Sequence, residues 1–215
     1  MRHYMFDIDG TLVQSHDMDE TCFLDALYHV TGIQLTPDWS HFPYVTDRGI
    51  LKTFIETHAP QHQLKDLERD VKNKFIENIR TAIEISPIKP VKGAVEFINA
   101  LKNRQDVSIS FATGGWLETA LLKLESAGFD TTDIAIASSN DHYCRTEIMK
   151  TAALLATGCK NNPFVYFGDG EWDVKACAQL GVKLVLVGDR TQHHISIPDF
   201  NNQTSVLALA GDLGA

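Results

Sequence analysis

From about residue 89 onward, strand-like apolar runs alternate with helix-like amphipathic runs, and this alternation constrains the fold more than any other feature. Short runs rich in β-branched and aromatic residues predict strands, whereas apolar residues three and four apart predict helices. The predicted strands fall at 107–115, 133–140, 164–170 and 182–188, and the predicted helices at 94–103, 116–129, 145–158 and 172–181. Such alternation predicts an α/β fold, a doubly wound parallel sheet with helices on both faces.

The first part of the chain has a different pattern. The run YMFDI at 4–8 predicts a buried strand, but the next predicted strand lies more than eighty residues later. Between them are three amphipathic helical stretches at 19–33, 47–58 and 63–84, followed by a segment with two prolines and a glycine at 86–93. Prolines and glycines of this kind favour a hinge. We therefore expect residues 14–88 to form an inserted α-helical cap domain, and residues 1–13 and 89–215 to form the core domain.

The overall charge and the cysteines limit the class of protein. The net charge of -9 over 215 residues disfavours nucleic-acid and membrane-surface partners, which need a basic face. No apolar run could cross a bilayer, and the six residues before Asp7 leave no room for a signal peptide. The four cysteines form no Cys-x-x-Cys pair, which favours reduced thiols in a cytoplasmic protein. The oligomeric state is not specified by any of these features.

Polar side chains collect where the predicted strands end. The set consists of Asp7, Asp9, Thr113, Gly114, Arg145, Asp169 and Asp173. Because the carboxyl ends of parallel strands meet at one edge of a sheet, we expect these residues to converge in one crevice. Each aspartate taken alone could instead cap a helix or form a turn. Their joint placement favours a functional site.

The predicted cluster of four carboxylates requires a cation. Two carboxylates about 5 Å apart repel by roughly 3 kcal/mol at an effective dielectric constant of about 20. Ligands that are all oxygen atoms favour Mg²⁺, and its predicted ligands are Asp7, Asp9, Asp169 and Asp173. Magnesium often shares its coordination shell with a phosphate group, so the expected substrate is a small phosphorylated metabolite.

The same residues predict a reaction. Asp7 can attack phosphorus to form an aspartyl phosphate, and Asp9 can serve as the general acid and base. Thr113, Gly114 and Arg145 can bind the phosphoryl oxygens. Arg48, in the predicted cap, could reach across to an anionic substrate, although it could equally pair with Asp47 or remain solvated.

Three motifs resemble those of the haloacid dehalogenase (HAD) superfamily. They are FDIDGTL at 6–12, ISFATGG at 109–115 and FGDGEWDV at 167–174, and the chain resembles the phosphoglycolate-phosphatase-like members with a helical cap. This resemblance implies that Asp7 is the nucleophile, Asp9 the acid/base and Thr113 a phosphate ligand. It also implies that Asp169, Asp173 and the main-chain carbonyl of Asp9 bind magnesium.

One motif departs from the family pattern. The third motif usually carries a lysine at the start of a helix, where this chain has Arg145; Lys150 is the alternative, but it lies more than a turn inside the predicted helix. We favour Arg145, which keeps the charge but spreads it over a planar fork.

The resulting prediction is a Mg²⁺-dependent HAD phosphatase, a phosphoric monoester hydrolase. By resemblance, phosphoglycolate-like or sugar-phosphate substrates suit this type of cap. One alternative is a sugar-phosphate mutase of the same fold, although the nearby His16 does not match the usual spacing of the mutase histidine. A second alternative is a non-enzymatic module, which would be expected to have lost the aspartates that this chain retains.

Overall fold

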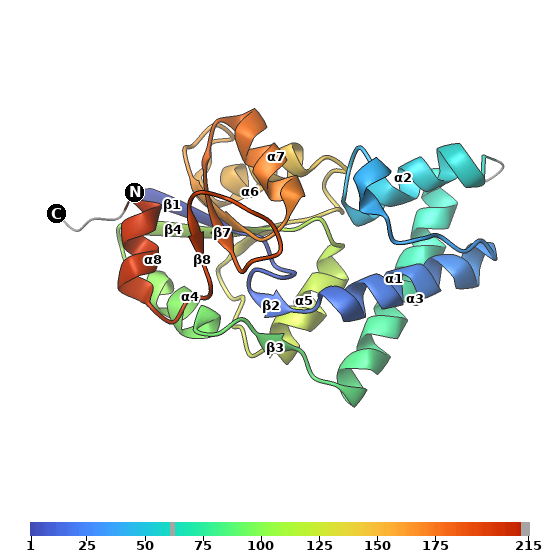
Figure 1. Cartoon of the computed structure of the whole chain (residues 1–215), viewed down its shortest axis with the longest axis horizontal. Coiled ribbons are helices and arrows are strands. Elements are labelled where there is room, and N and C mark those ends of the chain that lie inside the picture. The colour runs from blue at the N-terminus through green and yellow to red at the C-terminus, as the bar shows by residue number, and fades with distance from the viewer. Residues whose placement is uncertain (61–62, 212–215) are drawn as a thin grey trace.

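The computed structural model describes residues 1–60 and 63–211, and its centre is a six-stranded sheet (Figure 1). The strands run in the order β5-β4-β1-β6-β7-β8, and every neighbouring pair is parallel. Their bounds are β1 (Arg2–Phe6), β4 (Val107–Ala112), β5 (Ala135–Ala137), β6 (Val165–Gly168), β7 (Lys183–Val187) and β8 (Ser196–Ile197). The predicted α/β class is therefore confirmed.

Helices cover both faces of the sheet because successive strand residues point to opposite sides. Tyr4 and Phe6 belong to an apolar cluster with α4 (Ala94–Lys102), α5 (Leu117–Ser126) and α8 (Gln203–Ala210). Met5, between them, belongs to a second cluster with α6 (Arg145–Thr157) and α7 (Glu171–Leu180). Figure 1 shows α6 and α7 on one side of the sheet and α4 and α8 on the other. The sheet is thus buried on both faces, as a parallel sheet requires.

The helices of residues 16–85 pack together beside the sheet, at the far right of Figure 1. They are α1 (His16–Thr31), the short 3₁₀ helix η1 (Trp39–His41), α2 (Asp47–His58) and α3 (Leu64–Ile85). Phe23 of α1, Phe54 of α2 and Phe75 of α3 share one apolar cluster, and Trp116 of the sheet domain joins it. This packing supports the division into a core and a cap at 14–88, which remains our proposal.

A small antiparallel pair lies where the chain enters and leaves these helices. Strand β2 (Val13–Gln14) pairs with β3 (Lys89–Pro90), and Val13 lies opposite Pro90. We had expected only a hinge near 86–93. Proline fits here because its missing N–H is tolerated at the edge of a two-stranded ribbon.

Some elements were not predicted from the sequence. Strand β8 has two residues and helix α8 has eight, and η1 has three, so none is long enough for a clear periodic pattern. Strand β5 has only three residues, although the apolar pattern had suggested a longer one. The helices of the cap and core otherwise coincide closely with their predicted ranges.

Candidate active site

The register of the sheet brings three loops together at one edge. Phe6 of β1 pairs with Phe111 of β4 on one side and with Phe167 of β6 on the other. Each strand ends within one residue of these positions, so the loops that begin at Asp7, Thr113 and Asp169 are neighbours. This is the carboxyl edge of the sheet, where open α/β folds bind ligands.

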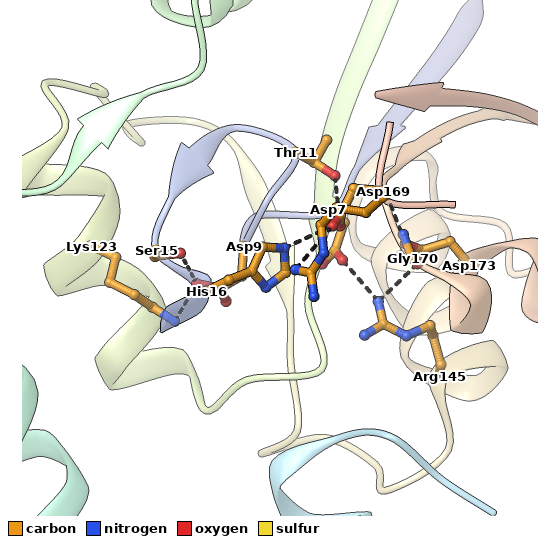
Figure 2. A network of polar contacts seen from close by, with 11 residues as sticks. Asp7, Asp9, Thr11, Ser15, His16, Lys123, Arg145, Asp169, Gly170 and Asp173 are labelled. Carbon is orange, nitrogen blue, oxygen red and sulfur yellow. Dashed lines mark hydrogen bonds and ion pairs between the residues drawn. The ribbon is translucent and has the colours of Figure 1, made fainter. Parts of the chain in front are cut away.

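Arg145 lies between two of the buried aspartates (Figure 2). Its Nη1 is 3.2 Å from Asp7 Oδ2 and 3.1 Å from Asp173 Oδ1. Lys150, the alternative cation, instead pairs with Glu147 at 2.7 Å on the surface of α6. Arg145 is the first residue of α6, so its side chain extends back over the helix N-terminus towards the strand ends. Of the two candidate cations, the structure thus brings Arg145 to the aspartates.

Burial shapes the charges of this group. Burial raises the pKa of Asp7 well above its ordinary value, while Arg145 opposes the rise. Burial also raises the pKa of Asp173 to about 6, again against the effect of Arg145. Asp173 Oδ2 accepts the N–H groups of Asp169 and Gly170, both at 3.1 Å. Asp173 therefore caps the start of α7, and its other oxygen faces Arg145.

Asp169, the third buried aspartate, has its own polar partners. Thr11 Oγ1 donates to Asp169 Oδ1 at 3.4 Å, and His16 Nε2 lies 2.7 Å from Oδ2. Arg190 Nη1 is 3.8 Å from the same oxygen. Gly10 makes this approach possible, because a Cβ at its position would lie 1.9 Å from His16 Nε2. Gly10 also has a φ of +80°, which side chains other than glycine rarely adopt.

The carboxylates of Asp7, Asp169 and Asp173 fit a divalent cation. One oxygen from each lies within 4.8 Å of the others, and all three residues are buried. A hard cation prefers such oxygen ligands, and it would relieve the repulsion that burial intensifies. The carboxylate of Asp9, which we had also expected at the metal, is not in this group of described residues. A ligand role for Asp9 rests on its main-chain carbonyl alone.

Asp9 is held by Lys123, a buried lysine that the sequence motifs do not indicate. Ser15 Oγ donates to Asp9 Oδ1 at 2.5 Å, and Lys123 Nζ contacts the same oxygen at 2.5 Å. Lys123 is fully buried and also contacts Asp19 of α1 at 2.5 Å (Figure 2 shows the contacts with Asp9). Burial favours a raised pKa for Asp9, but Lys123 and Ser15 outweigh it and lower the pKa. Asp9 is therefore held through one oxygen, Oδ1, and these partners favour its charged form before a substrate binds.

Thr113 and the glycines after it form a tight turn against the cap. Thr113 is buried, and its Oγ1 accepts the N–H of Gly115 at 3.0 Å. The carbonyl of Gly114 accepts the N–H of Asp47 at 2.8 Å. A Cβ on Gly114 would lie 2.6 Å from Arg145 Nη2, so glycine permits the close approach of the guanidinium.

A cavity of about 160 Å³ lies over these residues, and residues of both the core and the proposed cap line it. From the core it is lined by Asp7, Asp9, Thr113, Gly114, Gly115, Arg145, Trp172 and Arg190. From the cap it is lined by His16, Asp17, Asp19, Glu20, Phe23, Trp39, Val45, Thr46, Asp47 and Ile50. The cavity is large enough for a small ligand only, and it joins the carboxyl edge of the sheet to the helices of the cap.

Arg48 is not brought to this cavity. Its side-chain Nε pairs with Glu68 of α3 at 3.1 Å. Its main-chain N–H donates to Ser139 Oγ at 3.0 Å. The neighbouring Asp47 lines the cavity instead, and its Oδ2 accepts the N–H of Trp116 at 2.8 Å. Adjacent residues of a helix point about 100° apart, and here Asp47 lies at the cavity while the side chain of Arg48 lies against Glu68 of α3.

A sequence signal for Lys123 existed. Within the predicted helix 116–129, the buried positions Ala120, Leu124 and Ala127 follow the i, i+4, i+7 pattern, and Lys123 occupies the i+3 position of the same face. A lone lysine at a core position needs a buried partner. Its partners, Asp9 and Asp19, lie more than a hundred residues earlier, so the pattern alone could not identify them.

Comparisons with known proteins agree with this geometry. A family model for haloacid dehalogenase-like hydrolases matches residues 1–181. No helix in the described part of the chain is long and apolar enough to cross a membrane. A search of curated proteins found no match.

Several solved structures share the fold. A hydrolase from Pseudomonas syringae is 19% identical with a TM-score of 0.75, and the alignment covers all of both chains. A β-phosphoglucomutase from Clostridium difficile is 13% identical with a TM-score of 0.75, covering 99% of this chain and 98% of the other. CbbY from Rhodobacter sphaeroides, in complex with phosphate, is 15% identical with a TM-score of 0.70, covering 94% and 96%.

Proposed function

Because the chain belongs to the haloacid dehalogenase-like hydrolase family, we propose that it is a Mg²⁺-dependent phosphatase of small phosphate monoesters that acts through an aspartyl phosphate at Asp7. The observation that carries the proposal is the buried group of Asp7, Asp169 and Asp173 with Arg145 against two of them. This group combines a nucleophile, oxygen ligands for a cation and a fixed positive charge beside one cavity. Phosphoryl transfer needs mainly such positioning and charge neutralisation.

Different residues would bind the phosphoryl group and the metal ion. Arg145, the hydroxyl of Thr113 and the main-chain N–H groups near Gly114 are donors for the phosphoryl oxygens. Asp7, Asp169 and Asp173 would hold Mg²⁺, with the main-chain carbonyl of Asp9. When bound, the ion would supply positive charge against the charge that develops on the phosphoryl group.

The reaction would have two steps. The carboxylate of Asp7 attacks phosphorus, the bond to the alcohol oxygen breaks, and Asp9, which has taken up a proton at Oδ2 when the substrate binds, donates that proton to the alcohol oxygen. Asp9 then takes a proton from water, whose oxygen attacks phosphorus, so phosphate leaves and Asp7 is restored. The contacts of Asp9 with Ser15 and Lys123 both use Oδ1, which leaves Oδ2 for this proton transfer.

A sugar-phosphate mutase is the second candidate, since a β-phosphoglucomutase shares the fold. The cap histidine nearest the first motif, His16, contacts Asp169 and not Asp9. This contact does not favour the mutase. Product analysis separates the two activities, since a mutase isomerises a sugar phosphate without net release of phosphate.

The test is phosphate release from a panel of small phosphate esters, with and without Mg²⁺. Wild type, Asp7→Asn and the surface control Asp66→Asn are compared. We expect release that requires Mg²⁺, is lost in Asp7→Asn and is retained in Asp66→Asn. Folded protein that releases no phosphate from any ester with Mg²⁺ present would contradict the proposal.

A further inference from the structure

The cap side of the active-site cavity has an unusual charge. Its ionisable lining residues are Asp17, Asp19, Glu20, Asp47 and His16. Across the described ranges, the cap contributes no lysine or arginine to this lining. His16 is already engaged by Asp169 at 2.7 Å. The wall that would face the alcohol portion of a phosphate ester is therefore acidic.

Three of these four carboxylates have no lysine or arginine partner among the described residues, and only Asp19 forms an ion pair. Asp19 is paired with Lys123, and Asp47 accepts the N–H of Trp116. Asp17 and Glu20, one turn apart on α1, have no lysine or arginine within ion-pair distance in the described structure. Residues three apart on a helix share one face, so the two negative charges lie together.

Aromatic side chains line the same cavity as these charges. Trp39 Nε1 donates to Glu20 Oε2 at 2.8 Å, which fixes the indole and the carboxylate together in the cavity wall. Phe23 and Trp172 line the same cavity. Aromatic rings beside carboxylates are a suitable environment for an ammonium group, which is attracted by both.

The cations of the cavity lie on the opposite side, in the core. Arg145 contacts Asp7 and Asp173, where the phosphoryl group is expected. Arg190 is half exposed, and its Nη1 approaches Asp169. A carboxylate or second phosphate on the alcohol portion would therefore meet like charges in the cap.

We infer that the substrate is the phosphate monoester of an amino alcohol, whose ammonium group lies against Asp17, Glu20 and Trp39. This inference rests on the proposed phosphatase function and adds the chemical class of the leaving alcohol. The same wall disfavours leaving groups with an anionic end. Phosphoglycolate, the type of substrate suggested by the sequence resemblance, would be a poor substrate.

Three esters of two-carbon alcohols test this directly because they differ only in the terminal group. They are 2-aminoethyl phosphate, 2-hydroxyethyl phosphate and phosphoglycolate. We expect kcat/KM for the ammonium ester to exceed that for the carboxylate ester by roughly tenfold or more, with the hydroxyl ester between them. An uncharged aryl phosphate is included as a general phosphatase substrate.

Variants that change the charge of single residues show which residues cause the preference for the ammonium ester. Glu20→Gln and Asp17→Asn should each reduce the ratio of kcat/KM between the ammonium and carboxylate esters, and Glu20→Lys should invert it. Asp25→Asn is the matched control, because Asp25 is an exposed carboxylate of the same helix outside the cavity. It should leave the ratio unchanged.

The outcomes distinguish the two proposals. Hydrolysis of the aryl phosphate together with a preference for phosphoglycolate would overturn the inference and leave the phosphatase function standing. If that preference disappeared in Arg190→Gln, the subsite would belong to Arg190 instead. An equal rate for all three esters, unaffected by Glu20→Gln, would also overturn the inference. No release from any ester, the aryl phosphate included, would overturn the phosphatase function and the inference together.

Discussion

At the scale of single residues, the main question about the site is which cation lies beside the buried aspartates. The sequence offered Arg145 and Lys150, and only the position of a helix start separated them. Arg145 reaches Asp7 and Asp173 through one nitrogen, whereas Lys150 pairs with Glu147 on the surface. Its guanidinium also lies 5.9 Å from the ring of Trp172, which restricts its orientation.

Arg145→Gln should lower kcat/KM for a phosphate ester by roughly 100-fold or more, because a fixed charge beside the reacting group is lost. Arg145→Lys should recover part of the activity, since it keeps the charge but not the planar fork. Lys150→Gln is the matched control and should retain nearly full activity. An Arg145→Gln enzyme as active as wild type, or a larger loss in Lys150→Gln, would show that the wrong cation has been assigned.

A second residue-scale prediction concerns His3, which is buried in β1 with its Nε2 2.8 Å from Ser110 Oγ. Burial lowers the pKa of His3 from 6.5 to about 4. Between these values the unfolded chain binds a proton that the folded protein does not, so stability falls as pH drops from about 6.5 to about 4.

This effect should remove about 2 kcal/mol of unfolding free energy between pH 7 and pH 5. Urea unfolding at the two pH values measures it. Other groups also titrate in this range, so the comparison is with His3→Gln, which can keep a hydrogen bond but not the titration. The variant should lose about 2 kcal/mol less than wild type over the same interval; an equal loss in both proteins would rule out His3 as the cause.

At the scale of secondary-structure elements, Lys123 connects three parts of the chain. It extends from α5 to Asp9 in the loop after β1 and to Asp19 in α1. Burial alone would lower the pKa of Lys123, but the two carboxylates raise it above its usual value. The ammonium group therefore remains charged and joins the candidate acid/base residue to the cap.

Lys123→Met should destabilise the fold by about 3 kcal/mol, because it leaves two largely buried carboxylates without their cation. Lys72→Met is the matched control, since Lys72 of α3 pairs with Glu118 of α5 at 2.8 Å on the surface. Removing that exposed pair should cost about 1 kcal/mol or less. Urea unfolding measures the free energy of unfolding of both variants. Similar losses in the two would show that the Lys123 ion pairs stabilise the fold no more than the surface pair does.

The sequence predicted most elements because their patterns are local. The apolar spacing of Leu67, Val71, Phe75 and Ile79 predicts α3, and all four are buried. The contacts that complete the site are not local. Lys123 is 114 residues from Asp9, and the choice between Asp47 and Arg48 depends on how α2 is rotated against the core. Apolar periodicity predicts a helix and its apolar face. It does not predict which of two adjacent polar residues of that helix will line the cavity.

At the scale of the whole molecule, the carboxyl edge of the sheet and helices α1 and α2 line one cavity, and Asp7 of the acidic cluster is among its lining residues. The three carboxylates of the cluster come from two strand ends and the start of α7. A cation bound there would be bound by the folded protein and not by the unfolded chain. Such binding stabilises the folded state by mass action.

Mg²⁺ should therefore raise the thermal unfolding temperature. At an ion concentration 100 times the dissociation constant, binding should increase the free energy of unfolding by about 2.7 kcal/mol. Removal of the ion by a chelator should reverse the increase. Asp173→Asn should abolish it, and Asp66→Asn should not. The same increase in wild type and Asp173→Asn would place the ion at another site.

The most direct test of the central claim is to trap the phosphorylated enzyme during turnover. Wild type is mixed with a phosphate ester and Mg²⁺, quenched in acid, digested and analysed by mass spectrometry. The account predicts one phosphoryl group on Asp7, absent from Asp7→Asn. A phosphoryl group on another residue, or phosphate release by the Asp7→Asn enzyme at the wild-type rate, would contradict it.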